Sequence, residues 1–242
     1  MILYHGTHFK NLDVILKEGV TPRKNKQARK KRKSNFKISP SHPDMVYMST
    51  AYPFYYATQA GEDITKGLVL EIHADKLDES LCYPDEDFVY QKMRLAVEGL
   101  SHPYIRDNLT FYQYLKDESL SYSGCMCYKG SVPVSAIVRY CVIDFQQRQQ
   151  LAWEMMQPSI SIMNYKVAGD KYRKIVQWCF GDIEELPFIQ EAKNQKQMFE
   201  ANKSAEIQKI KDSFNCDERI EVWSQESKDR TGIEVVSINE VK

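Results

Sequence analysis

The start of the chain sets the tightest limit on how it folds. Met1–Tyr4 is a short apolar run of β type, and Phe9–Glu18 has the apolar spacing of a helix. Between them stands the triplet His5-Gly6-Thr7. The sequence therefore predicts a strand that ends on this triplet and leads directly into a helix. A glycine at such a place lets another group approach the backbone closely.

A second strand is predicted at Met45–Ser49, with Tyr47 at its centre. An aromatic helix follows, because Pro53 suits the first turn of a helix and several tyrosines come directly after it. Further strands are predicted at 67–73, 125–128 and 136–144.

The strand ending in His5-Gly6-Thr7, the helix after it and the later strand bearing Tyr47 resemble the ADP-ribosyltransferase superfamily. The resemblance is to the His-Tyr-Glu branch, which contains the poly(ADP-ribose) polymerase catalytic domains and related toxins. It covers residues 3–60 well and residues 67–144 loosely. It implies an α+β fold, with a split mixed β-sheet core, helices around it and a C-terminal helical extension.

The resemblance also implies that NAD is the co-substrate. His5 matches the histidine that hydrogen-bonds a ribose hydroxyl, and Gly6 matches the glycine whose backbone pairs with the nicotinamide amide. Tyr47 matches the stacking tyrosine, because a flat cationic ring suits an aromatic face. The NAD-binding set implied in this way is His5, Gly6, Thr7, Tyr47, Ser49, Tyr55 and Tyr56.

The family's glutamate has no counterpart on the expected strand, because residues 123–130 contain no acid. Breaking the bond to nicotinamide develops positive charge on the ribose, so a nearby carboxylate is expected. Glu86 in the acidic turn Asp85-Glu86-Asp87 is the predicted replacement, which makes the catalytic set His5, Tyr47 and Glu86. Glu118 and the C-terminal glutamates are alternatives. The turn is equally explained as a solvated helix N-terminus.

A basic run extends over residues 23–37, with nine Lys or Arg and no acid. Such a run neutralises phosphates, so it predicts a nucleic-acid acceptor, RNA more than DNA. The alternatives are a solvated loop or contacts to the pyrophosphate of NAD. The predicted acceptor-binding residues are Arg29, Lys30, Lys31, Arg32 and Lys33.

The character of the chain changes near residue 146. Residues 1–145 are predicted to form the catalytic domain, and residues 146–242 a helical extension packed on it. Helices are predicted at 146–156, 165–180 and 187–214, followed by a terminal hairpin from 219–223 and 232–238. The apolar stripe of the third helix is expected either to pack on the rest of the protein or to bind a partner. The candidate partner is a neutralising protein.

Composition is that of a globular protein, with 43% hydrophobic residues, 27% charged residues and a net charge of zero. The chain has no signal-peptide pattern and no run of the roughly 20 apolar residues that span a membrane. The expectation is therefore a cytoplasmic protein without a membrane partner. The six cysteines form no CxxC pair, so reduced thiols and no metal site are expected.

These features together predict an NAD-dependent mono-ADP-ribosyltransferase, a toxin or phage-defence effector that modifies nucleic acid. Three alternatives stay open. The first is transfer to a protein acceptor. The second is a chain that retains an NAD pocket without transfer, as the missing late glutamate allows. The third is an RNA 2′-phosphotransferase, which the sequence favours least, because that family needs arginines with its histidine and Tyr4 precedes His5.

Overall fold

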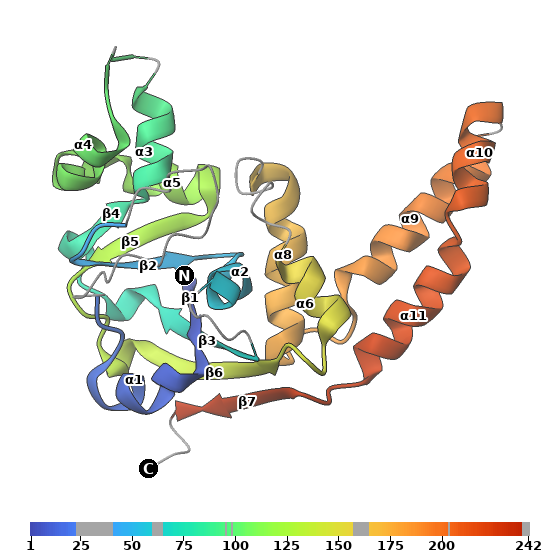
Figure 1. Ribbon diagram of the computed structural model, residues 1–242, viewed down its shortest axis with the longest axis horizontal. Helices are drawn as coiled ribbons and strands as arrows, with labels where there is room; N and C mark the ends of the chain where they lie inside the picture. The colour runs from blue at the N-terminus through green and yellow to red at the C-terminus, as the bar shows by residue number, and fades with distance from the viewer. Residues whose placement is uncertain are drawn as a thin grey trace.

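The core of the protein is one β-sheet. The computed structural model describes residues 1–22, 41–59, 65–94, 96–97, 99–156, 165–202 and 204–238. Seven strands follow the order β4-β5-β2-β1-β3-β6-β7 (Figure 1). They are β1 (Ile2–His8), β2 (Met45–Ser49), β3 (Lys66–His73), β4 (Cys82–Pro84), β5 (Cys125–Lys129), β6 (Ile137–Asp144) and β7 (Ile233–Ser237).

The fold is α+β, as predicted. The sheet is not mixed, however, because each pairing between these strands is antiparallel. None of these pairs needs the long crossover that parallel neighbours require. The prediction of a mixed sheet was therefore wrong.

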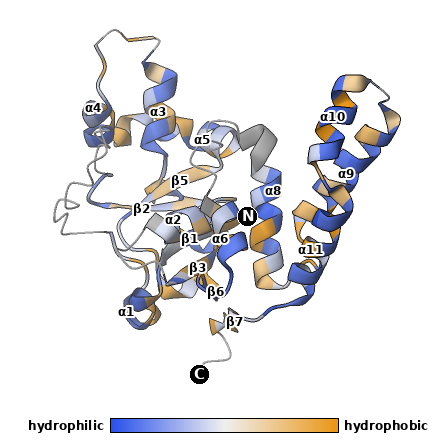
Figure 2. Ribbon diagram, turned by 45° about the vertical axis from the view of Figure 1, so that its right-hand side comes forward, coloured by the Kyte–Doolittle hydropathy of each residue, from blue (hydrophilic) through white to orange (hydrophobic). Residues whose placement is uncertain are grey.

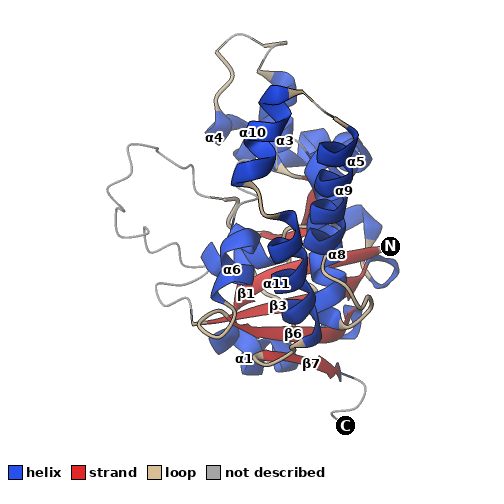
Figure 3. Cartoon of the chain, turned by 90° about the vertical axis from the view of Figure 1, so that its right-hand side faces the viewer, coloured by secondary structure: helices blue, strands red, loops and turns tan. Residues whose placement is uncertain are grey.

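Helices cover both faces of the sheet (Figure 3). They are α1 (Leu12–Glu18), α2 (Pro53–Gln59), α3 (Glu86–Met93), α4 (His102–Asp107), α5 (Lys116–Ser123), α6 (Gln149–Met156), α8 (Tyr165–Phe180), α9 (Pro187–Ala201), α10 (Ala205–Ser213) and α11 (Cys216–Lys228). A 3-10 segment, η4 (Leu109–Leu115), links α4 and α5. Helices α2, α6 and α8 share one apolar cluster with the sheet, α1 packs into a second, and α3, α4 and η4 build a third over β2, β4 and β5.

Strand β3 shows why the sheet is covered on both sides. Leu68, Leu70 and Ile72 belong to the cluster that α1 joins, whereas Val69 belongs to the cluster of α2 and α8. All four side chains are fully buried. Because successive side chains of a strand point to opposite faces, a strand buried on both faces requires an element on each.

The sheet is split between β1 and β2. Strand β1 pairs with β3 along its whole length, and β2 pairs with β5 along its whole length. Between β1 and β2, in contrast, the register joins only Tyr4 and Ser49. The two halves of the sheet therefore separate beyond this pair, in the direction of His5 on one strand and Tyr47 on the other.

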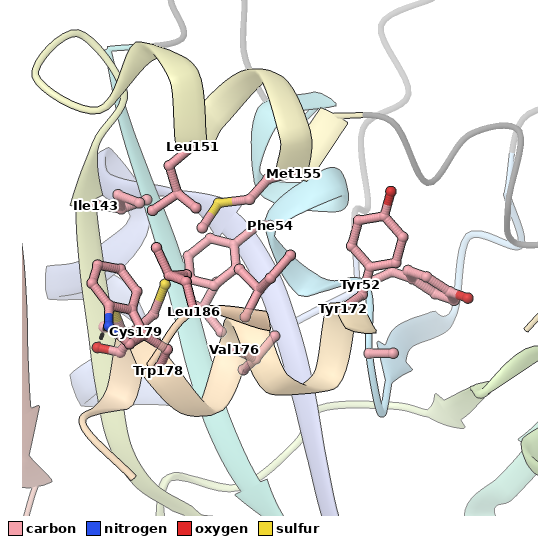
Figure 4. Packing of buried hydrophobic residues seen from close by; sticks show 14 of the residues in the cluster. Tyr52, Phe54, Ile143, Leu151, Met155, Tyr172, Val176, Trp178, Cys179 and Leu186 are labelled. Carbon is pink, nitrogen blue, oxygen red and sulfur yellow. Dashed lines mark hydrogen bonds between the residues drawn. The ribbon is translucent and has the colours of Figure 1, made fainter. Parts of the chain in front are cut away.

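The region after residue 146 packs on the same core as the sheet. Trp178 of α8 is fully buried and lies in one cluster with Phe54 of α2 and Leu151 of α6 (Figure 4). Its indole Nε1 donates to the carbonyl of Ser227, 3.3 Å away, so α8 is also attached to the end of α11.

The predicted helix 187–214 is broken in two. Helix α9 ends at Ala201, where Asn202 has extended backbone angles, and Ser204 caps α10 by accepting from the amide of Ile207. Helices α9, α10 and α11 extend away from the sheet (Figure 1), and hydrophobic and hydrophilic segments alternate along them (Figure 2). A capping serine after an extended residue gives the physical reason for the break.

The predicted terminal hairpin is absent from the described part of the chain. Residues 219–223 lie within α11, because Cys216, Trp223 and Ser227 are buried at helical spacing and Trp223 packs on Phe188 of α9, with ring centroids 4.3 Å apart. The last strand, β7, pairs with β6 instead and extends the sheet by one strand.

Candidate functional site

His5 reaches across the split in the sheet. Its ring nitrogen Nδ1 lies 2.8 Å from the backbone carbonyl oxygen of Tyr47. A carbonyl oxygen only accepts hydrogen bonds, so Nδ1 carries the proton and donates it. In the neutral imidazole, the other nitrogen, Nε2, is then an acceptor. A side chain thus takes the place of backbone pairing where β1 and β2 separate.

Tyr47 connects the split to the acidic turn. Its phenol hydroxyl donates to Oε2 of Glu86, the first residue of α3. The backbone amide of His42 donates to the Tyr47 hydroxyl at 2.9 Å and approaches Glu86 Oε2 at 3.4 Å. His5, Tyr47 and Glu86, predicted separately as the catalytic set, therefore lie along one connected path from β1 through β2 to α3.

Glu86 is held in place by the cap of its helix. The side chain of Asp85 accepts from the amides of Asp87 and Phe88, which fixes the start of α3. As a result Glu86 is only 4% exposed. The alternative of a purely solvated helix N-terminus therefore does not describe Glu86.

Burial governs the charge state of this pair. Burial raises the pKa of the Glu86 carboxyl, against the hydrogen bond from Tyr47, while Asp87 adds to the rise and His102 opposes it. Burial, and then the charge of Glu86, raise the pKa of the Tyr47 phenol well above its usual range. The phenol thus stays protonated and serves as the donor. Burial likewise raises the pKa of Asp85, to about 8.

Gly6 allows α2 to pack against β1. A Cβ atom at this position would lie 1.7 Å from the carbonyl oxygen of Pro53 and 2.8 Å from the amide nitrogen of Ala57. Both are backbone atoms of α2, which cannot rotate away. Whatever Gly6 does for a ligand, only glycine fits beneath this helix.

Thr7 and Ser49 have structural partners at the two ends of the split. The Thr7 hydroxyl accepts from Asn11 Nδ2 at 2.9 Å. The Ser49 hydroxyl, fully buried, accepts from the amides of Ala51 and Tyr52 and so shapes the turn into α2. The contacts of these two members of the predicted NAD-binding set thus hold local structure.

The two helix tyrosines of the predicted set lie together on α2. Their ring centroids are 5.4 Å apart in an edge-on arrangement. The Tyr56 hydroxyl lies 3.5 Å from Sγ of Cys125 on β5, and burial raises the pKa of that phenol well above its usual value. Tyr55 and Tyr56 are only partly exposed and pack against the cluster of α2 and α8.

The other residues that the sequence suggested lie elsewhere. Glu118 of α5 forms an ion pair with Lys92 and is half exposed, and Glu226 of α11 binds the buried Arg148 at 2.8 Å. The residues predicted to bind the acceptor lie outside the described residues; they are Arg29, Lys30, Lys31, Arg32 and Lys33. Among the residues that are described, no group of His, Cys, Asp and Glu could hold a metal ion, and all six cysteines are free.

Two further residues lie near the candidate site. Cys127 of β5 stands opposite Tyr47 in the sheet register. Arg106 of α4 is close enough that Glu86 and Tyr47 raise its pKa, after the larger effect of its bond to Asp107. Both positions depend on pairings between distant segments, which no local pattern encodes.

Comparison with protein-family models and with curated proteins finds no match for this chain. Among solved structures, the chain is similar to one named EcPltA, with 12% sequence identity and a TM-score of 0.35. That similarity covers 61% of this chain and 78% of the other. Within the described residues, no helix has the length and apolar character to cross a membrane.

Proposed function

We propose that this chain binds NAD at the split between β1 and β2 and transfers its ADP-ribose. The observation that carries the proposal is the path from His5 across the split to Tyr47 and on to Glu86. Three residues from distant parts of the chain meet there, each of a type that this reaction needs. A histidine suits a ribose hydroxyl, an aromatic ring suits nicotinamide and a carboxylate suits developing positive charge.

His5 would hold the sugar. Its Nδ1 proton is committed to the Tyr47 carbonyl, which fixes both the ring orientation and the tautomer. The Nε2 atom of the neutral ring then accepts a hydrogen bond from a hydroxyl donor. A ribose hydroxyl is such a donor, so the geometry supports sugar binding and not proton abstraction at Nδ1.

Glu86 would supply the negative charge. Its carboxylate is supported by the Tyr47 hydroxyl, and a fixed charge in a buried place stabilises an opposite charge more than it does in water. Bound NAD supplies a bond to nicotinamide whose cleavage develops positive charge on the ribose. The raised pKa of Glu86 means that this stabilisation is available only above that pKa.

The residues present fit NAD in part. The separation of β1 from β2 beyond the Tyr4 and Ser49 pair opens backbone edges for an amide-bearing ring. Tyr47 is partly exposed, and its side chain packs against the cluster of α3, α4 and η4. Gly6 lies at the same place, but its Cα faces α2. A ligand in the split would therefore contact the peptide groups of Gly6 and not its Cα.

A nucleic-acid acceptor, RNA more than DNA, is the further part of the proposal. It is supported by the nine basic residues of 23–37, a sequence argument alone, since these residues are not described by the structure. A role as a toxin or defence effector in the cytoplasm is also proposed from the sequence alone.

Release of nicotinamide from NAD tests the activity. The purified protein is incubated with NAD and free nicotinamide is measured by mass spectrometry. His5→Ala should abolish release, while His8→Ala, on the same strand, should retain it, because the His8 side chain caps the next turn by accepting from the amide of Lys10. Absence of release from the parent protein would refute the transferase proposal.

Labelled NAD tests the acceptor. The protein is offered separate pools of RNA, DNA and protein, and the pool that carries label is identified. Label on RNA supports the proposed acceptor, and label on protein alone would replace it. Binding of NAD without release of nicotinamide would instead indicate a pocket that no longer transfers, as the absence of an acid on β5 would explain.

A further inference from the structure

A cleft of about 480 Å³ lies where α8 meets the split sheet. Ile2 and Tyr4 of β1 line it from one side, Thr50 lines it just after β2, and Arg173 and Gln177 of α8 close the other side. Figures 2 and 3 show the start of the chain beside α8. The volume of the cleft falls in the range of about 300–1,000 Å³ that is typical of small-molecule sites.

The cleft borders the candidate NAD site without using its residues. Tyr4 precedes His5, and Thr50 follows Ser49, so the lining begins one position away on each strand. Adjacent residues of a strand are about 3.3 Å apart along it. The cleft therefore begins at the residues next to the split, but Tyr4 and His5 are successive residues of β1 and point to opposite faces of the sheet. His5, Tyr47 and Glu86 take no part in lining the cleft.

Helix α8 contributes a cation and an amide on one side. Arg173 and Gln177 are four residues apart, which places them one above the other on a helix. The Arg173 side chain is 40% exposed and lies 3.8 Å from Asp170 of the same helix. A guanidinium offers a planar fork of donors that matches a phosphate, and the amide of a glutamine both donates and accepts.

The strand side of the cleft offers a ring, hydroxyls and apolar surface. The Tyr4 ring stacks on Phe180 with centroids 5.7 Å apart and is only 4% exposed, so it forms a fixed part of the wall. Burial, and then the charge of Glu71, raise the pKa of its phenol, so the hydroxyl stays a donor. Thr50 adds a second hydroxyl, and Ile2 exposes apolar surface beside it. Flat apolar walls with a few polar groups suit a base and its sugar.

We propose that this cleft binds a nucleoside phosphate, with the phosphate on Arg173 and the base against the exposed side chain of Ile2. The nucleoside phosphate could belong to the nucleic-acid acceptor or to NAD itself, and the two sources share this chemistry. The role as acceptor site rests on the proposed ADP-ribosyl transfer, whereas nucleotide binding does not.

Calorimetric titration with uridine 5′-monophosphate and with uridine tests the site. The monophosphate should bind about tenfold or more tightly than the nucleoside, since a hydrogen-bonded charge pair has that effect. Arg173→Gln should remove the difference. Lys174→Gln is the matched control, because it deletes one charge from the same turn of α8. Lys174 pairs with Asp170 at 2.9 Å, as Arg173 does at a longer distance, but it does not line the cleft.

His5→Ala separates this inference from the proposed function. That variant should bind the monophosphate as the parent does while releasing no nicotinamide. Competition between NAD and the monophosphate would assign the cleft to the phosphates of NAD, and simultaneous binding would assign it to the acceptor. Failure of the monophosphate to bind, or equal losses in Arg173→Gln and Lys174→Gln, would overturn the inference. Binding in a parent that releases no nicotinamide would leave the cleft standing and remove only the transferase.

Discussion

Gly6→Ala should destabilise the protein through the contact between β1 and α2. The added Cβ would lie 1.7 Å from the Pro53 carbonyl oxygen, half of the 3.4 Å at which ordinary contact begins. It would also lie 2.8 Å from the Ala57 amide nitrogen. Because both are backbone atoms, the whole helix has to retreat. Phe54, which α2 buries in the core, would retreat with it.

The cost follows from this geometry. Inserting one carbon into a packed core costs about 1–3 kcal/mol, and a clash with backbone belongs at the upper end of that range. For a protein of this size, about 1 kcal/mol lowers the melting temperature by about 2–4 °C. Gly6→Ala is therefore expected to melt about 5–10 °C below the parent, in the absence of any ligand.

Thermal unfolding followed by circular dichroism measures the shift. Gly130→Ala is the comparison, since no heavy atom lies within 4 Å of its added Cβ and only its φ of +87° opposes the change. That strain costs about 1–2 kcal/mol. Adding Ala57→Gly to Gly6→Ala should give no rescue, because the clash is with backbone. A melting temperature for Gly6→Ala equal to that of the parent would refute the packing argument.

Two further predictions concern buried charges. Nicotinamide release should rise as the pH rises through the pKa of Glu86, above the usual carboxyl value of 4.5, because the ionised form is needed. The free energy of unfolding should fall as the pH rises over the same range, because a raised pKa of Glu86 favours the folded state only while the carboxyl is protonated. Glu86→Gln should flatten the pH profile of nicotinamide release and that of the free energy of unfolding. Arg139→Met should cost about 3–5 kcal/mol, because the buried Glu71 loses its arginine partner and is left with His73, 3.5 Å away. Glu71→Met added to it should recover much of the loss in urea unfolding. No recovery in the double variant would contradict that reasoning.

Several elements could be predicted from the sequence because local rules decide them. Helix α8 begins and ends at Tyr165 and Phe180, and β2 covers Met45–Ser49, both as predicted. Apolar periodicity and turn residues act within a few positions, so such boundaries need no knowledge of the rest of the chain. The same local signals failed at 219–223, where helical burial against α9 outweighed a strand-like composition.

The members of the candidate site were also named from the sequence, one by one. His5 and Tyr47 came from a resemblance, and Glu86 came from the search for a carboxylate. Whether they act together stays a prediction. The sequence does not show that the Tyr47 hydroxyl meets Glu86 or that His5 bonds the Tyr47 carbonyl, because the partners are 39 and 42 residues apart.

The tertiary structure alone decided the direction and order of the strands. Neither the antiparallel sheet nor its split at Tyr4 and Ser49 is written in any local pattern, because the pairing of distant strands depends on how all faces are buried together. The cleft beside Arg173 arises in the same way, from the packing of α8 against central strands of the sheet that are far from it in the sequence. The sequence determined which chemical groups the protein has, and the burial of both sheet faces determined which of them meet.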